Sequence, residues 1–83
     1  MSSITYSTRG TCSRQIDIEI DENRIITKVT FTGGCSGNTQ GVSALVVGMS
    51  VDEAIKRLEG IKCGPRSTSC PDQLAQALKG FNQ

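Results

Sequence analysis

The sequence has 83 residues and a formal net charge of +1, from nine Lys and Arg against eight Asp and Glu. A chain of this length is expected to form one domain, residues 1–83, with a small core. The near-neutral charge disfavours nucleic-acid binding, which needs a clustered basic face. No apolar run approaches the roughly 20 residues that span a membrane, and the first residues do not resemble a secretory signal. We therefore expect a cytoplasmic protein that does not contact membranes.

The β-strands are expected in the first half of the chain. Residues 4–8 form a weak β-rich stretch that predicts an edge strand. Residues 12–20 alternate apolar and polar side chains, the two-residue period of a half-buried strand. The apolar members of this alternation are Ile16, Ile18 and Ile20.

A hairpin is expected to follow the second strand. The polar residues 21–23 predict a tight turn centred near Glu22, which would place Cys12 opposite Thr32. Residues 24–32 then form the returning strand. The side chains expected to share one face of it are Ile25, Thr27, Val29 and Phe31.

Three helices are expected in the second half. The first ends near Gly48, the second begins at Ser50, which forms a capping box with Glu53, and ends at Gly60. The third starts near Pro71, since proline suits a first helical turn. Their expected buried stripes are Val42, Leu45, Val46 and Met49; Val51, Ala54, Ile55 and Leu58; and Leu74, Leu78 and Phe81. Strands followed by helices predict an α+β fold, a small antiparallel sheet of two or three strands with three helices packed on one face.

Four cysteines stand out in a chain with no His and no Trp. A small core often needs a disulfide, a metal or a partner chain to be stable. A disulfide framework requires an oxidising compartment, whereas clustered cysteines in the cytosol are more often metal ligands or redox thiols. Buried, inert thiols are the remaining alternative.

The predicted topology gathers the cysteines at one end of the domain. Cys12 and Cys35 lie at the open end of the hairpin. The second helix, if it returns antiparallel to the first, brings Cys63 to the same end, where Cys70 opens the last helix. Cys63 and Cys70 are seven residues apart, too far for a C-x-x-C redox motif or a common zinc-knuckle spacing. A metal site would therefore depend on convergence in space.

Charge near the cysteines is mostly positive. Asp72 is the only acid within three residues of a cysteine, and nearby cations favour the thiolate that binds metal. An ordinary excess of cations in loops would look the same. The cations are Arg9, Arg14, Lys62 and Arg66.

Residues 33–38, Gly-Gly-Cys-Ser-Gly-Asn, have the composition of a backbone nest that holds phosphate before a helix. They lack the lysine of a P-loop and the spacing of a dinucleotide fingerprint. Nucleotide binding by this glycine loop is therefore a lower-ranked hypothesis, and a simple strand-to-helix turn explains the glycines equally well.

Residues 68–72 read Thr-Ser-Cys-Pro-Asp and resemble the signature of the TSCPD domain family. The similarity extends along most of the chain, including residues 33–38 and 60–64. Small members of this family resemble four-cysteine proteins of unassigned function, and related domains form the C-terminal part of adenosylcobalamin-dependent ribonucleotide reductases. The resemblance implies a link to ribonucleotide reduction, although 83 residues cannot contain the catalytic barrel of that enzyme.

A more distant resemblance, over residues 11–81, is to the U-type iron–sulfur cluster scaffold proteins. It places Cys12, Cys35 and Cys70 on the three scaffold cysteines. Two positions depart from the scaffold pattern, since Arg14 replaces a functional Asp and Ser69 replaces a frequent His. Cys63 would then supply a fourth ligand.

The sequence leads to a metal-binding hypothesis with Cys12, Cys35, Cys63 and Cys70 as the ligands. Four thiolates without an open position are typical of structural Zn²⁺, and an iron–sulfur cluster is the alternative cofactor. The domain would be an accessory to ribonucleotide reduction or iron–sulfur chemistry, with a ribonucleotide reductase or an iron–sulfur assembly protein as partner. The competing hypothesis is a thiol–disulfide relay, with Cys63 and Cys70 as the redox pair, that delivers electrons to a ribonucleoside-diphosphate reductase. No catalytic site is evident in the chain itself.

Overall fold

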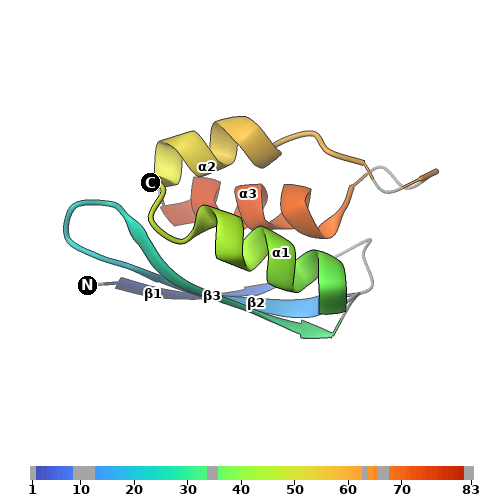
Figure 1. Ribbon diagram of the computed structural model, residues 1–83, viewed down its shortest axis with the longest axis horizontal. Coiled ribbons are helices and arrows are strands. Elements are labelled where there is room, and N and C mark those ends of the chain that lie inside the picture. The colour runs from blue at the N-terminus through green and yellow to red at the C-terminus, as the bar shows by residue number, and fades with distance from the viewer. Residues whose placement is uncertain (1, 9–12, 34–35, 63, 66–67, 82–83) are drawn as a thin grey trace.

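The computed structural model describes residues 2–8, 13–33, 36–62, 64–65 and 68–81. Three strands precede three helices, which confirms the predicted α+β class (Figure 1). The elements are β1 (Ser2–Ser7), β2 (Ser13–Ile20), β3 (Ile26–Gly33), α1 (Ser36–Val46), α2 (Val51–Leu58) and α3 (Cys70–Phe81). No helix in the described part of the chain is long and apolar enough to cross a membrane.

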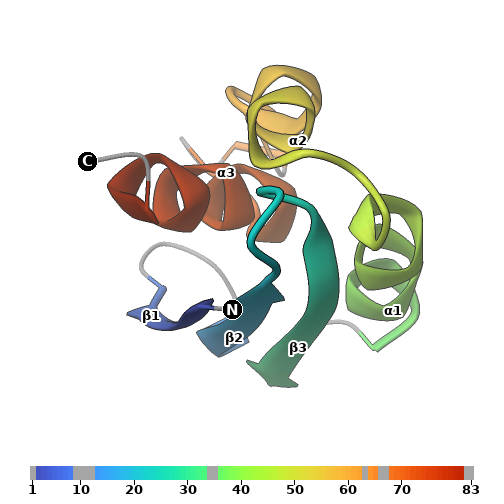
Figure 2. The same ribbon diagram turned by 90° about the vertical axis from the view of Figure 1, so that its left-hand side faces the viewer.

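The sheet is antiparallel throughout, with the strand order β1-β2-β3. The predicted edge strand is confirmed as β1. All three helices lie on one face of the sheet and leave the other face open (Figure 2). The arrangement therefore has two layers, with the core between the sheet and the helices.

The core is built from the isoleucines of β2 and the apolar stripe of α3. The period-two pattern in β2 is confirmed, because Ile16, Ile18 and Ile20 are all at most 1% exposed. Leu74 and Leu78 of α3 are fully buried against them. Burying such side chains contributes roughly 1.5–3 kcal/mol each, the main favourable term for a domain with so few aromatic residues.

The register of the β2–β3 hairpin differs from the prediction. The turn is centred on Asn23 rather than Glu22, because Asp21 and Ile25 form its closing pair, with the Asp21 N–H donating to the Ile25 carbonyl at 2.9 Å. The Asp21 carboxylate accepts from the N–H groups of Asn23 and Ile25, both at 2.9 Å, and so fixes the longer turn. Arg24 completes it in the left-handed region, with φ of 64°.

A β-bulge then moves the register by one more residue. Glu19 pairs with Lys28 but Ile20 pairs with Ile26, so Thr27 is the extra residue, and its hydroxyl donates to the Glu19 carbonyl at 3.1 Å. The predicted face of β3 is therefore wrong at its start: Ile26 is buried in place of Ile25, and Thr27 is exposed. Thr32 pairs with Gln15, so the expectation that it lies opposite Cys12 is also wrong.

The first helix departs from its predicted stripe at one position. Val46 is buried, but Leu45 is 71% exposed. The physical reason is that α2 packs mainly against α3 and leaves an apolar groove of about 250 Å³ beside α1, which Leu45 lines. Gly48, with φ of 96°, follows the end of α1 as predicted.

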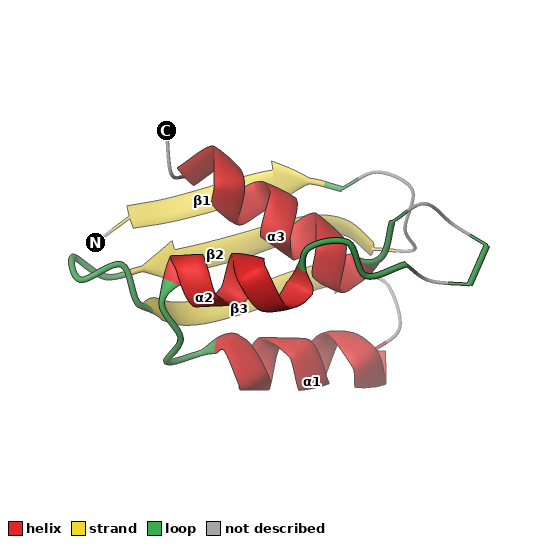
Figure 3. Cartoon of the chain, turned by 90° about the horizontal axis from the view of Figure 1, so that it is seen from above, coloured by secondary structure: helices red, strands yellow, loops and turns green. Residues whose placement is uncertain are grey.

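The connection from α1 to α2 is tied to the start of β3. The N–H of Ile26 donates to the Met49 carbonyl at 2.9 Å, and the N–H of Gly48 donates to the Ile26 carbonyl at 2.8 Å. Ser50 caps α2 as predicted, accepting from the Glu53 N–H at 3.2 Å. From this fixed point α2 runs back along the sheet, opposite in direction to α1 (Figure 3), so the predicted antiparallel return is confirmed.

Candidate functional site

Cys70 is the one predicted metal ligand that falls among the described residues. It is the first residue of α3 and is buried, with 6% of its surface exposed. Cys12, Cys35 and Cys63 lie outside the described residues. Within the part of the chain that the structure describes, no three Cys, His, Asp or Glu side chains are grouped closely enough to hold a metal ion. The four-cysteine site therefore stays a prediction.

The elements that neighbour these cysteines in sequence nevertheless meet at one end of the domain. Ser13, which follows Cys12, pairs with Gly33 at the open end of the hairpin. The first residues of α1 and α3 lie at this same end, to the right in Figure 3, and α2 runs toward it. The antiparallel topology thus produces the convergence of strand and helix ends that the sequence predicted.

Ser69 forms the N-cap of α3. Its hydroxyl oxygen accepts from the Asp72 N–H at 3.1 Å, and its carbonyl accepts from the Gln73 N–H at 2.8 Å. The same hydroxyl donates to the carbonyl of Ile61 at 2.6 Å. Ser69 is 4% exposed. It therefore joins the start of α3 to the segment that follows α2.

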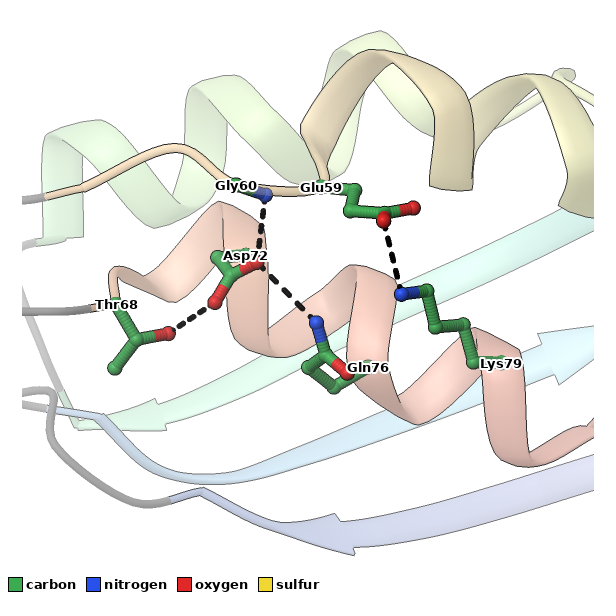
Figure 4. Close-up of polar contacts among 6 residues, drawn as sticks. All are labelled: Glu59, Gly60, Thr68, Asp72, Gln76 and Lys79. Carbon is green, nitrogen blue, oxygen red and sulfur yellow. Dashed lines mark hydrogen bonds and ion pairs between the residues drawn. The ribbon is translucent and has the colours of Figure 1, made fainter.

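Asp72 makes a second set of links across the same junction (Figure 4). Its carboxylate accepts from the Thr68 hydroxyl, from the Gly60 N–H at 2.8 Å and from the Gln76 side chain at 3.4 Å. Asp72 is 8% exposed, so a charged group is buried with hydrogen bonds to it from three directions. Lys79 and Glu59 form an ion pair at 3.0 Å beside it, half exposed and so worth little on its own.

The protonation of Asp72 follows from these contacts. Burial is the largest single influence and raises the pKa, but the hydrogen bonds from Thr68, Gly60 and Gln76, with the charge of Lys79, outweigh it. The pKa of Asp72 therefore lies below its usual value of 3.8. The carboxylate is ionised at neutral pH and serves as a structural acceptor.

We name Thr68, Ser69 and Asp72, with the backbone of Gly60 and Ile61, the α3 clamp. The clamp closes the base of the connection between α2 and α3 and fixes the first turn of α3, where Cys70 lies. The sequence prediction treated Asp72 only as an acid near a cysteine. The Ser69-x-x-Asp72 spacing, which matches Ser50-x-x-Glu53, signals the cap of Ser69 on the Asp72 N–H but not the contacts of the Asp72 carboxylate.

Replacing Ser69 with alanine is expected to lower the free energy of unfolding by about 2–3 kcal/mol, because the cap and the link to Ile61 are both lost. Ser50→Ala is the matched control, since Ser50 caps α2 through one bond to the Glu53 N–H, and it is expected to cost about 1 kcal/mol. Urea unfolding of both variants measures the difference. An equal loss in the two would contradict the joining role of Ser69.

Gly33, the first residue of the glycine loop, lines an open groove. Gly33 ends β3 with φ of 80°, and Gly34 and Cys35 lie outside the described residues. The groove between β3 and α1 has a volume of about 430 Å³. Its described lining is Val29, Thr30, Phe31, Gly33, Thr39, Gln40 and Ser43. None of these is a cation, so this lining offers no charge partner for a phosphate.

The cations predicted near the cysteines are placed only in part. Arg14 in β2 and Lys62 after α2 are both exposed, and Arg9 and Arg66 lie outside the described residues. The acid in this region, Asp72, is already bound within the α3 clamp.

Comparison with known proteins agrees with the Thr-Ser-Cys-Pro-Asp signature of residues 68–72. The family model described as the TSCPD domain matches residues 2–82, nearly the whole chain. The chain belongs to the TSCPD domain family. In this TSCPD domain the Thr, Ser and Asp of the signature build the α3 clamp. No curated protein and no solved structure matches the chain.

Proposed function

We propose that this TSCPD domain binds one metal centre through Cys12, Cys35, Cys63 and Cys70. The observation that supports it best is the meeting of β2, β3, α1 and α3 at one end of the fold. Each cysteine is adjacent in sequence to a described residue of these elements or of the α2–α3 connection: Cys12 to Ser13, Cys35 to Ser36, Cys63 to Gly64 and Cys70 to Ser69. Neighbouring Cα atoms are about 3.8 Å apart, which limits how far the four can separate.

The donor chemistry suits a soft or borderline metal. Four thiolates and no imidazole are the ligand set of structural Zn²⁺ sites, and iron–sulfur clusters use the same ligands. Such a metal would cross-link the start of β2, the β3–α1 connection, the α2–α3 connection and the start of α3, and would contribute on the order of 10 kcal/mol to folding. We propose Zn²⁺ as the occupant, with an iron–sulfur cluster as the alternative, and an accessory role in ribonucleotide reduction or iron–sulfur chemistry.

Metal analysis and absorption spectra of the anaerobically purified protein test this proposal. One zinc per chain, with thiols that react only after a strong chelator is added, is the expected result. Visible absorption with bound iron and sulfide would indicate the cluster. Metal-free protein with four reactive thiols before chelation would contradict the proposal.

A thiol–disulfide relay is the second candidate, and the bond between Ser69 and Ile61 favours it. This bond holds the chain two residues before Cys63 against the residue that precedes Cys70. In a relay the two thiols would lose two electrons and two protons as one S–S bond forms, and a reductase would receive the electrons. Thiols that react without chelator, and a Cys63–Cys70 disulfide after mild oxidation, would support the relay.

Nucleotide binding by the glycine loop is tested separately by titrating the protein with deoxynucleotides. A protein spectrum that does not shift during the titration would exclude this hypothesis.

A further inference from the structure

We propose that β1 is a self-association edge, and that it pairs antiparallel with β1 of a second copy of this chain around Thr5. The inference is independent of the proposed metal centre, because it rests on residues 2–8 and their pairing with β2. Two-fold pairing would join two three-stranded sheets into one continuous sheet.

The direction of the backbone groups in β1 follows from one hydrogen bond. The N–H of Thr8 donates to the Arg14 carbonyl next to the start of β2, at 3.1 Å. Backbone direction alternates along a strand, so Tyr6, Ile4 and Ser2 also direct their N–H and carbonyl groups toward β2. The remaining residues, Ser3, Thr5 and Ser7, direct theirs outward, along the edge of the sheet.

These three outward residues are symmetric about Thr5. A two-fold axis at Thr5 places it opposite Thr5 of the second copy and Ser3 opposite Ser7 of that copy. All three then form hydrogen-bonded pairs, about six backbone bonds in total. This register therefore gives the outward N–H and carbonyl groups of Ser3, Thr5 and Ser7 hydrogen-bond partners on the second copy.

The same register extends the hydrophobic core. Ile4 and Tyr6 lie on the helix-covered face of β1, are half buried, and pack against the core cluster. In the pairing around Thr5, Ile4 lies opposite Tyr6 of the second copy, twice by symmetry. An aromatic side chain facing a β-branched one is a stabilising cross-strand pair.

Charge favours a second copy as the occupant of this edge. β1 contains no charged residue and no Pro, the features that usually protect edge strands from pairing. The nearest acid across the sheet is Asp17, which accepts from the Thr5 hydroxyl at 2.9 Å. The two Asp17 side chains would be three strand spacings apart, about 14 Å, beyond the screening length of about 8 Å in physiological salt.

The opposite edge of the sheet, β3, contains a charged residue and has a helix packed along it. β3 contains Lys28, which pairs with Glu19 at 3.9 Å, and α1 packs along this strand. Figure 2 shows α1 beside β3, whereas no described helix or strand lies along the outer side of β1. The protected edge and the unprotected edge thus occur in one sheet, which provides an internal control.

Sedimentation equilibrium of the full chain tests the proposal. A reversible dimer with a dissociation constant below about 1 mM is expected. Thr5→Pro removes the central outward N–H and the hydroxyl bond to Asp17 but leaves the backbone bonds to β2 in place, so it is expected to raise the dissociation constant at least about tenfold. Thr5→Lys, which sets two like charges opposite each other, is expected to act in the same direction even if the proline variant folds poorly.

Thr30→Lys is the matched control. Thr5 in β1 and Thr30 in β3 both pair with Asp17 and are both exposed, so both lysine variants place a cation beside Asp17 and alter opposite edges of the sheet; Thr5→Lys also removes the Thr5 hydroxyl bond to Asp17. Thr30→Lys is expected to leave the dimer unchanged. A wild-type monomer at about 1 mM, or a dimer weakened by Thr30→Lys and not by Thr5→Lys, would overturn the proposal.

Amide hydrogen exchange gives a second readout. In the dimer, the N–H groups of Ser3, Thr5 and Ser7 are expected to become protected as the protein concentration rises, while those of Ile4 and Tyr6 are protected at every concentration. Protection of the outward amides that does not depend on concentration would also overturn the proposal.

Discussion

A Cys35→Ser variant is expected to lose its bound metal and to unfold at least about 20 °C below the wild-type chain. Removing one of four thiolates opens the proposed site, and the folding free energy that the metal supplies is lost with it. The effect would be large because the core of this domain is small and has few large side chains. Metal content and thermal unfolding, measured on the same anaerobic sample, check both parts.

The control for this experiment is Ala44→Ser in α1. Ala44 is exposed and lies outside the helix surface that contacts the core. Serine at this position is therefore expected to lower the free energy of unfolding by only about 0.5 kcal/mol, which shifts the melting temperature by only a few degrees. If Cys35→Ser had the same melting temperature as Ala44→Ser and kept a full equivalent of metal, the four-cysteine proposal would be wrong.

Asp72→Asn is expected to produce the second large effect, a loss of about 2–4 kcal/mol at neutral pH. The amide has one oxygen where the carboxylate has two, so it cannot accept from Thr68 and Gly60 with charge-assisted strength. It also places a donor where the surrounding groups are donors. Urea unfolding measures the loss. Asp52→Asn is the matched control, because Asp52 is also in the first turn of a helix but lies in an exposed ion pair with Arg24, so a change within about 0.5 kcal/mol is expected.

The pH dependence of this difference has a definite sign. The pKa of Asp72 is lowered in the folded state, so its contribution to stability is fully present above the unfolded value of 3.8. The contribution is lost as the pH falls through the lower, folded-state pKa. The stability difference between wild type and Asp72→Asn is therefore expected to be constant near neutral pH and to shrink below pH 3.8. A difference that grows in acid would show that Asp72 has another role.

The elements of this fold could be predicted because each one follows a local rule. Period-two isoleucines gave β2, and Ser50 gave the start of α2. The register of the hairpin could not be predicted in the same way. It depends on the Asp21 carboxylate, which accepts from Ile25, and on the bulge at Thr27, and these contacts form only when the strands are already paired.

The candidate site, like the fold, could be predicted only in part. The convergence of the strand and helix ends followed from antiparallel topology and was predicted. The tertiary role of Asp72 was missed, because its link to the Gly60 N–H spans twelve residues and is not visible in a local pattern. Likewise Leu45 fits an apolar stripe, but its exposure depends on where α2 packs.

The α3 clamp separates the base of the α2–α3 connection from its tip. Gly60 is joined through Asp72 to Thr68, and Ile61 is joined to Ser69, by contacts among the described residues. Insertions into a loop whose ends are already joined cost little, since the closure entropy grows only with the logarithm of length. An insertion between Gly64 and Pro65, for example of an epitope, is therefore expected to leave the rest of the domain folded unchanged, provided that Cys63 and Cys70 are kept for the proposed metal centre.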